Sequence, residues 1–194
     1  MQQIEQIKQI IETSIAVKQK LLLNATLLQT VEQIVQATVS AYQLDKRVYF
    51  CGNGGSAADA QHLAAEFSGR FYINRKPLYA EALHVNTSYI TAVANDFSYN
   101  DIYSRMIEAA GRKGDILFAI STSGNSQNII NAIEVAKNQG VICIGMTGET
   151  GGKMKELCDF LLNVPSKETP RIQESHILLG HIICELVEKQ LFGE

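Results

Sequence analysis

Residues that interrupt regular structure are scarce in this chain, above all near its start. The sequence has three prolines, and its first 45 residues contain neither proline nor glycine. Stretches without these residues favour helix, and apolar side chains recur here at helical spacing over 4–22 and again over 27–42. We therefore expect two N-terminal helices, or one long helix with an interruption near Asn24.

Other absences exclude whole classes of protein. Four cysteines are present without a CxxC pair, which predicts buried, reduced thiols. Lysine and arginine form no basic block and the formal net charge is -3, so nucleic acid is not an expected partner. No apolar run approaches the roughly 20 residues that span a bilayer, and the polar N-terminus lacks the apolar core of a signal peptide. We expect a cytoplasmic protein without a membrane partner.

Beyond Asp45, short apolar runs alternate with helix-like segments. The runs lie near residues 47–51, 79–84, 115–120, 141–146 and 160–164, and the helix-like segments are 56–69, 87–94, 100–111, 126–139, 152–157 and 170–192. This alternation predicts βαβ units, a mainly parallel sheet and helices on both of its faces. We thus divide the chain into N-terminal helices over 1–45 and an α/β domain over 46–194.

The apolar surface exceeds what one such sheet needs for cover. The last predicted helix is apolar around much of its circumference, and the N-terminal helices carry further apolar stripes. This excess predicts a homo-oligomer, and residues 1–45 are the segment that we expect to form its contacts.

Two polar loops come directly after predicted strands and before predicted helices. The first is Gly52-Asn53-Gly54-Gly55-Ser56 and the second is Ser121-Thr122-Ser123-Gly124-Asn125-Ser126. Backbone N–H groups at a helix start and nearby hydroxyls suit phosphate oxygens, and ligands of open α/β sheets lie at the carboxyl ends of the strands. Together the loops predict a phosphate site, although each alone also fits ordinary turn and N-cap chemistry.

Nucleotide-binding motifs match less well. Residues 52–57 fit the dinucleotide pattern G-x-G-x-x-G/A, but the next strand carries its acidic residue, Glu81, inside the strand rather than at its end. Neither loop is followed by the lysine of a P-loop. A nucleotide-dependent oxidoreductase and a P-loop ATPase are therefore disfavoured.

A few side chains outside the loops are candidates for chemistry. His62 and Glu66 are spaced i, i+4 on one helix face, which fits a divalent metal, an acid/base pair or a surface polar pair. His181 lies among Ile and Leu, where it is either a core residue or a catalyst, and Gln173 at a helix start is typical of a capping or solvent residue. Asn95-Asp96 fit both a polyhydroxy ligand and turn chemistry.

Five segments together resemble one known family. In order and spacing, the chain is similar to the sugar isomerase (SIS) domain family, and within it to the phosphoheptose isomerases, through CGNGGSAADAQHLAAEFSGR, AVANDFSYNDIYSR, GDILFAISTSGNS, MTGETGGKM and RIQESHILLGHIICELVE. The resemblance covers nearly the whole chain and is weakest over 1–40 and 72–90. It implies a three-layer αβα sandwich around a five-stranded parallel sheet, with the N-terminal helices as an extension. It also implies a homotetramer with active sites at subunit interfaces.

The same resemblance implies an activity and the residues that perform it. Phosphoheptose isomerases convert D-sedoheptulose 7-phosphate into D-glycero-D-manno-heptose 7-phosphate, which feeds ADP- and GDP-heptose and lipopolysaccharide core synthesis. Acid/base roles are implied for Glu66 and His181, and a divalent metal, often zinc, is implied at His62, Glu66, Gln173 and His181. Substrate contacts are implied at Asn53, Gly54, Gly55, Ser56, Glu66, Asn95, Asp96, Ser121, Thr122, Ser123, Ser126 and Gln173.

Two further expectations follow from these positions. The main alternative is a non-catalytic SIS-domain regulator that binds a sugar phosphate or a replication initiator protein; the DnaA initiator-associating relative lacks the acid and histidine that match Glu66 and His181 here.

Gln173 and His181 are eight residues apart, about 12 Å along a straight helix and about 80° around it. We therefore expect each site to be shared between subunits, with His181 or Gln173 donated by a neighbour.

Overall fold

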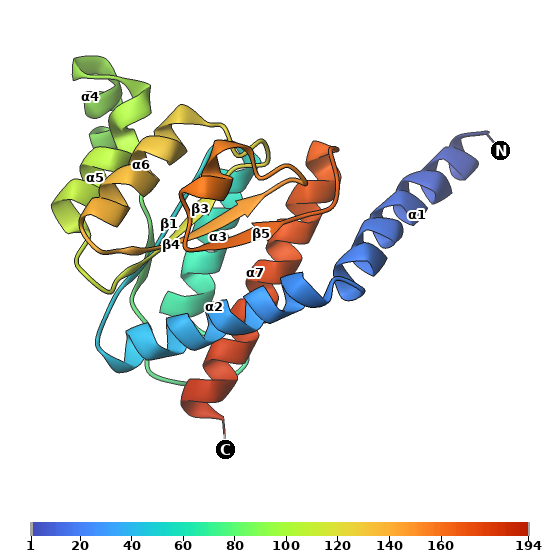
Figure 1. Cartoon of the computed structure of the whole chain (residues 1–194), viewed down its shortest axis with the longest axis horizontal. Helices are drawn as coiled ribbons and strands as arrows, with labels where there is room; N and C mark the ends of the chain where they lie inside the picture. Colours follow the sequence, from blue (N-terminus) through green and yellow to red (C-terminus); the bar gives the residue numbers. More distant parts are fainter. Residues whose placement is uncertain (1, 194) are drawn as a thin grey trace.

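A parallel sheet lies between two sets of helices in the computed structural model, which describes residues 2–193 (Figure 1). The sheet has five strands in the order β2-β1-β3-β4-β5, and all neighbouring pairs are parallel. Their bounds are Val48–Gly52 (β1), Ala80–Ala82 (β2), Ile116–Ile120 (β3), Ile142–Thr147 (β4) and Phe160–Asn163 (β5). The predicted three-layer αβα sandwich is confirmed.

Continuous apolar runs form the central strands because both faces of the sheet are covered. Every residue of β1 and β3 is buried. Successive side chains point to opposite faces, so Val48 and Phe50 join one hydrophobic core while Tyr49 and Cys51 join the other. The first core is covered by α2 (Ala25–Gln43), α3 (Gly55–Ser68) and α7 (Thr169–Phe192), and the second by α4 (Thr87–Asp96), α5 (Ile102–Ala110) and α6 (Gln127–Asn138).

The N-terminal segment consists of two helices, as predicted. Helix α1 spans Gln2–Leu22, and the Asn24 side chain caps α2 by accepting a hydrogen bond from the Leu27 N–H at 3.1 Å. Helix α1 projects away from the rest of the molecule (Figure 1). Its end near α2 buries Val17 and Leu21, whereas its isoleucines stay about half exposed, at Ile4, Ile7, Ile10, Ile11 and Ile15.

Two predicted helices differ from the observed ones. The segment expected over 152–157 is a 3-10 helix, η2 (Gly152–Glu156), and two positive-φ glycines, Gly151 and Gly152, stand at its start. The segment expected over 100–111 is divided into a 3-10 turn, η1 (Tyr99–Asp101), and α5, because the Ser98 side chain accepts from the Asn100 N–H and begins the turn.

All four cysteines are unpaired, as predicted, and three of them are fully buried. None of the helices within residues 2–193 combines the length and the hydropathy of a transmembrane span.

Candidate active site

Both polar loops lie where the order of the strands in the sheet reverses. The chain passes from β1 outwards to β2, then returns to place β3 on the other side of β1. The crevice beside the carboxyl ends of β1 and β3 is therefore a topological switch point, the usual ligand site of such sheets. The loop after β1 (residues 52–56, the glycine loop) and the loop after β3 (residues 121–126, the hydroxyl loop) both open there.

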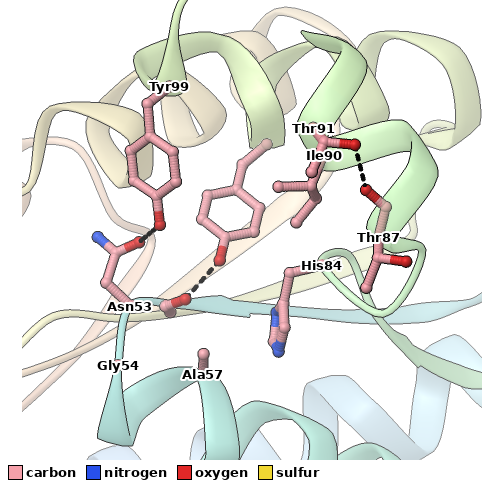
Figure 2. A pocket seen from close by; sticks show the side chains of 10 residues that line it. Asn53, Gly54, Ala57, His84, Thr87, Ile90, Thr91 and Tyr99 are labelled. Carbon is pink, nitrogen blue, oxygen red and sulfur yellow. Dashed lines mark hydrogen bonds between the residues drawn. The ribbon is translucent and has the colours of Figure 1, made fainter. Parts of the chain in front are cut away.

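The glycine loop is held by side-chain amides. Asn53 and Asn128 exchange two hydrogen bonds, with N–O distances of 2.9 and 2.8 Å, and the Tyr99 hydroxyl donates to the Asn53 Oδ1 at 3.3 Å (Figure 2). Gly54 takes a φ of +56°, a conformation that side chains rarely adopt, and it forms the N-cap of α3. The predicted contact residue Ser56 is buried in the first turn of that helix.

Gln173 reaches this loop from α7. A Cβ atom added to Gly55 would lie 2.5 Å from the Gln173 side-chain nitrogen, so only glycine leaves room for that amide. The start of α7 and the start of α3 are thus in contact within one chain. The structure places Gln173 beside the predicted phosphate loop.

A cavity of about 230 Å³ adjoins the glycine loop on the α4 side (Figure 2). Its wall includes Tyr99, Tyr103 and His84, and the Tyr103 hydroxyl donates to the Gly52 carbonyl oxygen. Burial lowers the pKa of His84, and neither of its ring nitrogens has a hydrogen-bond partner among the described residues. Asn95 and Asp96 are the last two residues of α4. Both are exposed, and the Asn95 amide donates to the Asp96 carboxylate at 2.9 Å.

The hydroxyl loop gathers serine side chains. The Ser121 Oγ lies 3.1 Å from the Ser126 Oγ and 3.5 Å from the Ser123 Oγ. Thr122 and Ser123 also line a cleft of about 240 Å³ that Lys167 borders from the segment before α7. Lys167, the one cation among the lining residues of this cleft, was not among the predicted site residues; its ammonium pairs with Glu149 of the same lining at 3.2 Å.

Three ligand-type side chains meet where α3 packs on α7. The Nε2 atoms of His62 and His181 are 2.9 Å apart, and the His62 Nε2 is 3.4 Å from the Glu66 Oε1. One ligand atom from each of the three lies within 4.8 Å of the others. Two imidazoles and a carboxylate are a donor set typical of zinc with an open coordination position. These residues therefore fit a divalent metal ion.

This group settles one half of an expectation. We expected His181 or Gln173 to come from a neighbouring subunit; His181 meets His62 and Glu66 from its own chain, so Gln173 is the residue for which the prediction stays open. The two helices approach closely because Gly180 lies against Leu63: a Cβ atom on Gly180 would be 2.6 Å from two Leu63 methyl carbons. Gln173 and His181 both lie on α7, eight residues apart, and His181 faces α3 of the same chain.

Asp59 is a further carboxylate at this group that the sequence-based reading missed. It lies on α3 one turn before His62, and its Oδ2 is buried without a partner among the described residues. Burial raises the pKa of Asp59, while the nearby His62 and His181 act in the opposite direction. Its i, i+3 spacing from His62 could have indicated, in the sequence, that the two side chains share one face of the helix.

Comparisons with known proteins identify the family and the fold. Residues 4–148 match the family model described as the SIS domain. A phosphoheptose isomerase from Clostridium acetobutylicum is 52% identical over 184 residues, covering 95% of this chain and 94% of the relative. The structure of a phosphoheptose isomerase from Neisseria gonorrhoeae matches with a TM-score of 0.90 at 40% identity, over 95% of this chain and 98% of the other. One from Francisella tularensis matches with a TM-score of 0.92 at 35% identity, over 97% and 100%.

Proposed function

The chain belongs to the SIS domain family, and on that premise we propose that it is a phosphoheptose isomerase. It converts D-sedoheptulose 7-phosphate into D-glycero-D-manno-heptose 7-phosphate, a precursor for ADP- and GDP-heptose and lipopolysaccharide core synthesis. The observation that carries the proposal is the close approach of three side chains, His62 and Glu66 on α3 and His181 on α7. Helix α3 begins at the glycine loop, so this group and the predicted phosphate loop share one helix.

The reaction moves one proton between two neighbouring carbons through an enediol, and it needs no redox partner. A base must take the proton from carbon, and an acid must exchange protons with the two oxygens. We assign the carbon proton to Glu66, which is half-buried, and the oxygen protons to His181. Zinc, held by His62, Glu66 and His181 of one chain with Gln173 of a neighbouring subunit as a further ligand, would polarise the substrate carbonyl when bound.

The two loops are assigned to the phosphate and the sugar hydroxyls. Ser121, Thr122, Ser123 and Ser126 offer hydroxyl donors, and the Lys167–Glu149 ion pair borders the same cleft. On α3, Gly55 and His62 are seven residues apart, about 10 Å along the helix. An extended sugar phosphate spans such a length, so it can be fixed at one end while it reacts at the other. Asn95 and Asp96 are the assigned contacts for hydroxyl groups of the sugar.

The assembled state that we assign is a homotetramer, and exposed apolar surface on α1 supports self-association. The isoleucine stripe of this helix is about half exposed, and a groove between α2 and α7, lined by Leu28, Ile182 and Leu186, offers a second apolar surface. Monomers rarely keep such surfaces in water. We assign residues 1–45 to the contacts between subunits and residues 46–194 to the sugar-phosphate site.

The direct test is incubation with sedoheptulose 7-phosphate, followed by NMR detection of the aldose, with and without a chelator. We expect conversion by the wild type, its loss with chelator and its return with added zinc. Glu66→Gln and His181→Ala should lose conversion while keeping the circular dichroism of the wild type. Glu108 is an exposed carboxylate on α5, which covers the opposite face of the sheet, so Glu108→Gln is the matched control. Binding of the sugar phosphate without any conversion by the wild type would instead support the non-catalytic regulator.

A further inference from the structure

A buried ion pair joins the loop after α3 to the end of α7. The Arg75 Nε lies 2.9 Å from the Glu188 Oε1, and both side chains are 2% exposed. The same carboxylate accepts backbone N–H groups of Phe71, Tyr72 and Ile73 at 2.9, 2.6 and 2.8 Å. Burial alone would raise the pKa of Glu188, but these donors outweigh it and lower the pKa, so the carboxylate is ionised.

The other side of the Arg75 guanidinium caps α3. Its Nη1 donates to the Phe67 carbonyl at 2.7 Å, and its Nη2 donates to the Glu66 carbonyl at 3.0 Å. The last carbonyls of a helix have no partner within the helix and carry its negative end, so a guanidinium there satisfies both needs. The capped turn is the one that carries Glu66.

Glu188 sits on the same side of α7 as His181. The two residues are seven positions apart, which is two turns and about 20° of rotation. Phe71, whose N–H is bound by Glu188, places its ring 5.8 Å from the His181 ring between centroids. The ion pair therefore contacts both helices of the metal-type group on the side away from the glycine loop.

We propose that Arg75 and Glu188 are positioning residues that fix α3 against α7 at the spacing at which His62, Glu66 and His181 bind one divalent metal ion. The inference rests on the proposed function for the metal site itself. Partners beyond the direct ligands commonly set ligand orientation, and their loss costs about 10- to 100-fold in metal affinity. A merely structural ion pair would change stability and leave the affinity of the folded protein unchanged.

The test measures metal binding by the purified full-length protein and does not depend on turnover. Arg75→Lys keeps the positive charge, but a single ammonium cannot bond to Glu188 and to both α3 carbonyls in the fork geometry of arginine. Zinc affinity is measured by competition with a coloured chelator, and the d–d absorption of the cobalt-loaded protein reports ligand geometry. We expect zinc affinity to fall about 10-fold or more and the cobalt bands to move.

Two further variants make the result decisive. Glu188→Gln keeps the size and one carbonyl acceptor but turns an NH2 group towards backbone or Arg75 donors and removes the charge that pairs with Arg75, so it should weaken zinc binding in the same direction. Glu185→Gln breaks the exposed Lys189–Glu185 pair on the same helix and should leave affinity and spectrum unchanged.

Two outcomes would overturn the proposal. Wild-type zinc affinity and cobalt spectrum in folded Glu188→Gln would refute it while leaving the metal site intact. Failure of the wild type to bind zinc more tightly than His181→Ala would refute the metal site itself, and the positioning role with it.

Discussion

The Asn53 and Asn128 side chains hydrogen-bond to each other and thereby hold the glycine loop against α6. Asn128 is buried, so its loss would leave the Asn53 amide without its partner. We expect Asn128→Ala to lower the free energy of unfolding by about 1 kcal/mol, the net contribution of a lost hydrogen bond, because the half-buried Asn53 amide can turn to water. Chemical denaturation measures this change, and KM for the sugar phosphate should rise because the loop loosens. Asn138→Ala, exposed at the end of the same helix, should change neither value.

His176 is a buried histidine that makes the stability of the protein depend on pH. Its Nε2 lies 3.1 Å from the Thr147 carbonyl oxygen, and burial lowers its pKa to about 4 from 6.5. The unfolded chain binds this proton below pH 6.5 and the folded chain does not. The contribution is therefore complete above pH 6.5 and is lost as pH falls from 6.5 towards 4.

The resulting prediction concerns the slope between these values. Over the full window the loss is on the order of 3 kcal/mol, since one pKa unit corresponds to about 1.4 kcal/mol. Urea unfolding at pH 7 and at pH 4.5 should show a smaller difference for His176→Gln than for the wild type. Equal differences in the two proteins would mean that His176 titrates alike in the folded and unfolded chain.

Among the elements, the α3–α7 pair depends on a glycine. Because a Cβ atom on Gly180 would lie 2.6 Å from Leu63 methyl carbons, Gly180→Ala overpacks this contact. Leu63→Ala alone leaves a cavity and should cost about 2–5 kcal/mol. In the Gly180→Ala background the same change relieves the overpacking, so it should cost less. A double-mutant cycle by denaturant unfolding measures this coupling, and strictly additive costs would contradict the contact.

The sequence predicted accurately those helices and strands that are determined by residues close to one another in the chain. Buried runs such as 116–120 are continuously apolar, and Asn24 has the side chain of a helix cap. The Arg75–Glu188 pair was invisible because its members are 113 residues apart and either one resembles an ordinary surface charge. The residues around His181 suggested a core position, and only the family resemblance assigned it to His62 and Glu66; the close approach of α7 to α3 at Gly180 and Leu63 is what lets it reach His62.

For the molecule as a whole, α1 offers the clearest test of assembly. Ile7 and Ile11 lie on one exposed face, and Gln9 faces the other side of the helix. Ile7→Glu with Ile11→Glu should place two charges in the subunit contact and reduce the mass in solution, as measured by light scattering. Gln9→Glu adds the same side chain outside the stripe and should preserve the mass. Unchanged mass in the double variant would remove α1 from the contact.

The unpaired thiols give the molecule an internal reporter. Cys51, Cys143 and Cys184 are fully buried, and burial raises the pKa of Cys143 and of the half-buried Cys158 to about 12. Thiol reagents attack the thiolate, so alkylation must wait until the surrounding layers separate. The four cysteines lie on β1, β4, the turn before β5 and α7, on both sides of the sheet. The order in which the four cysteines of the wild-type protein are alkylated therefore reports the order in which the elements around them open.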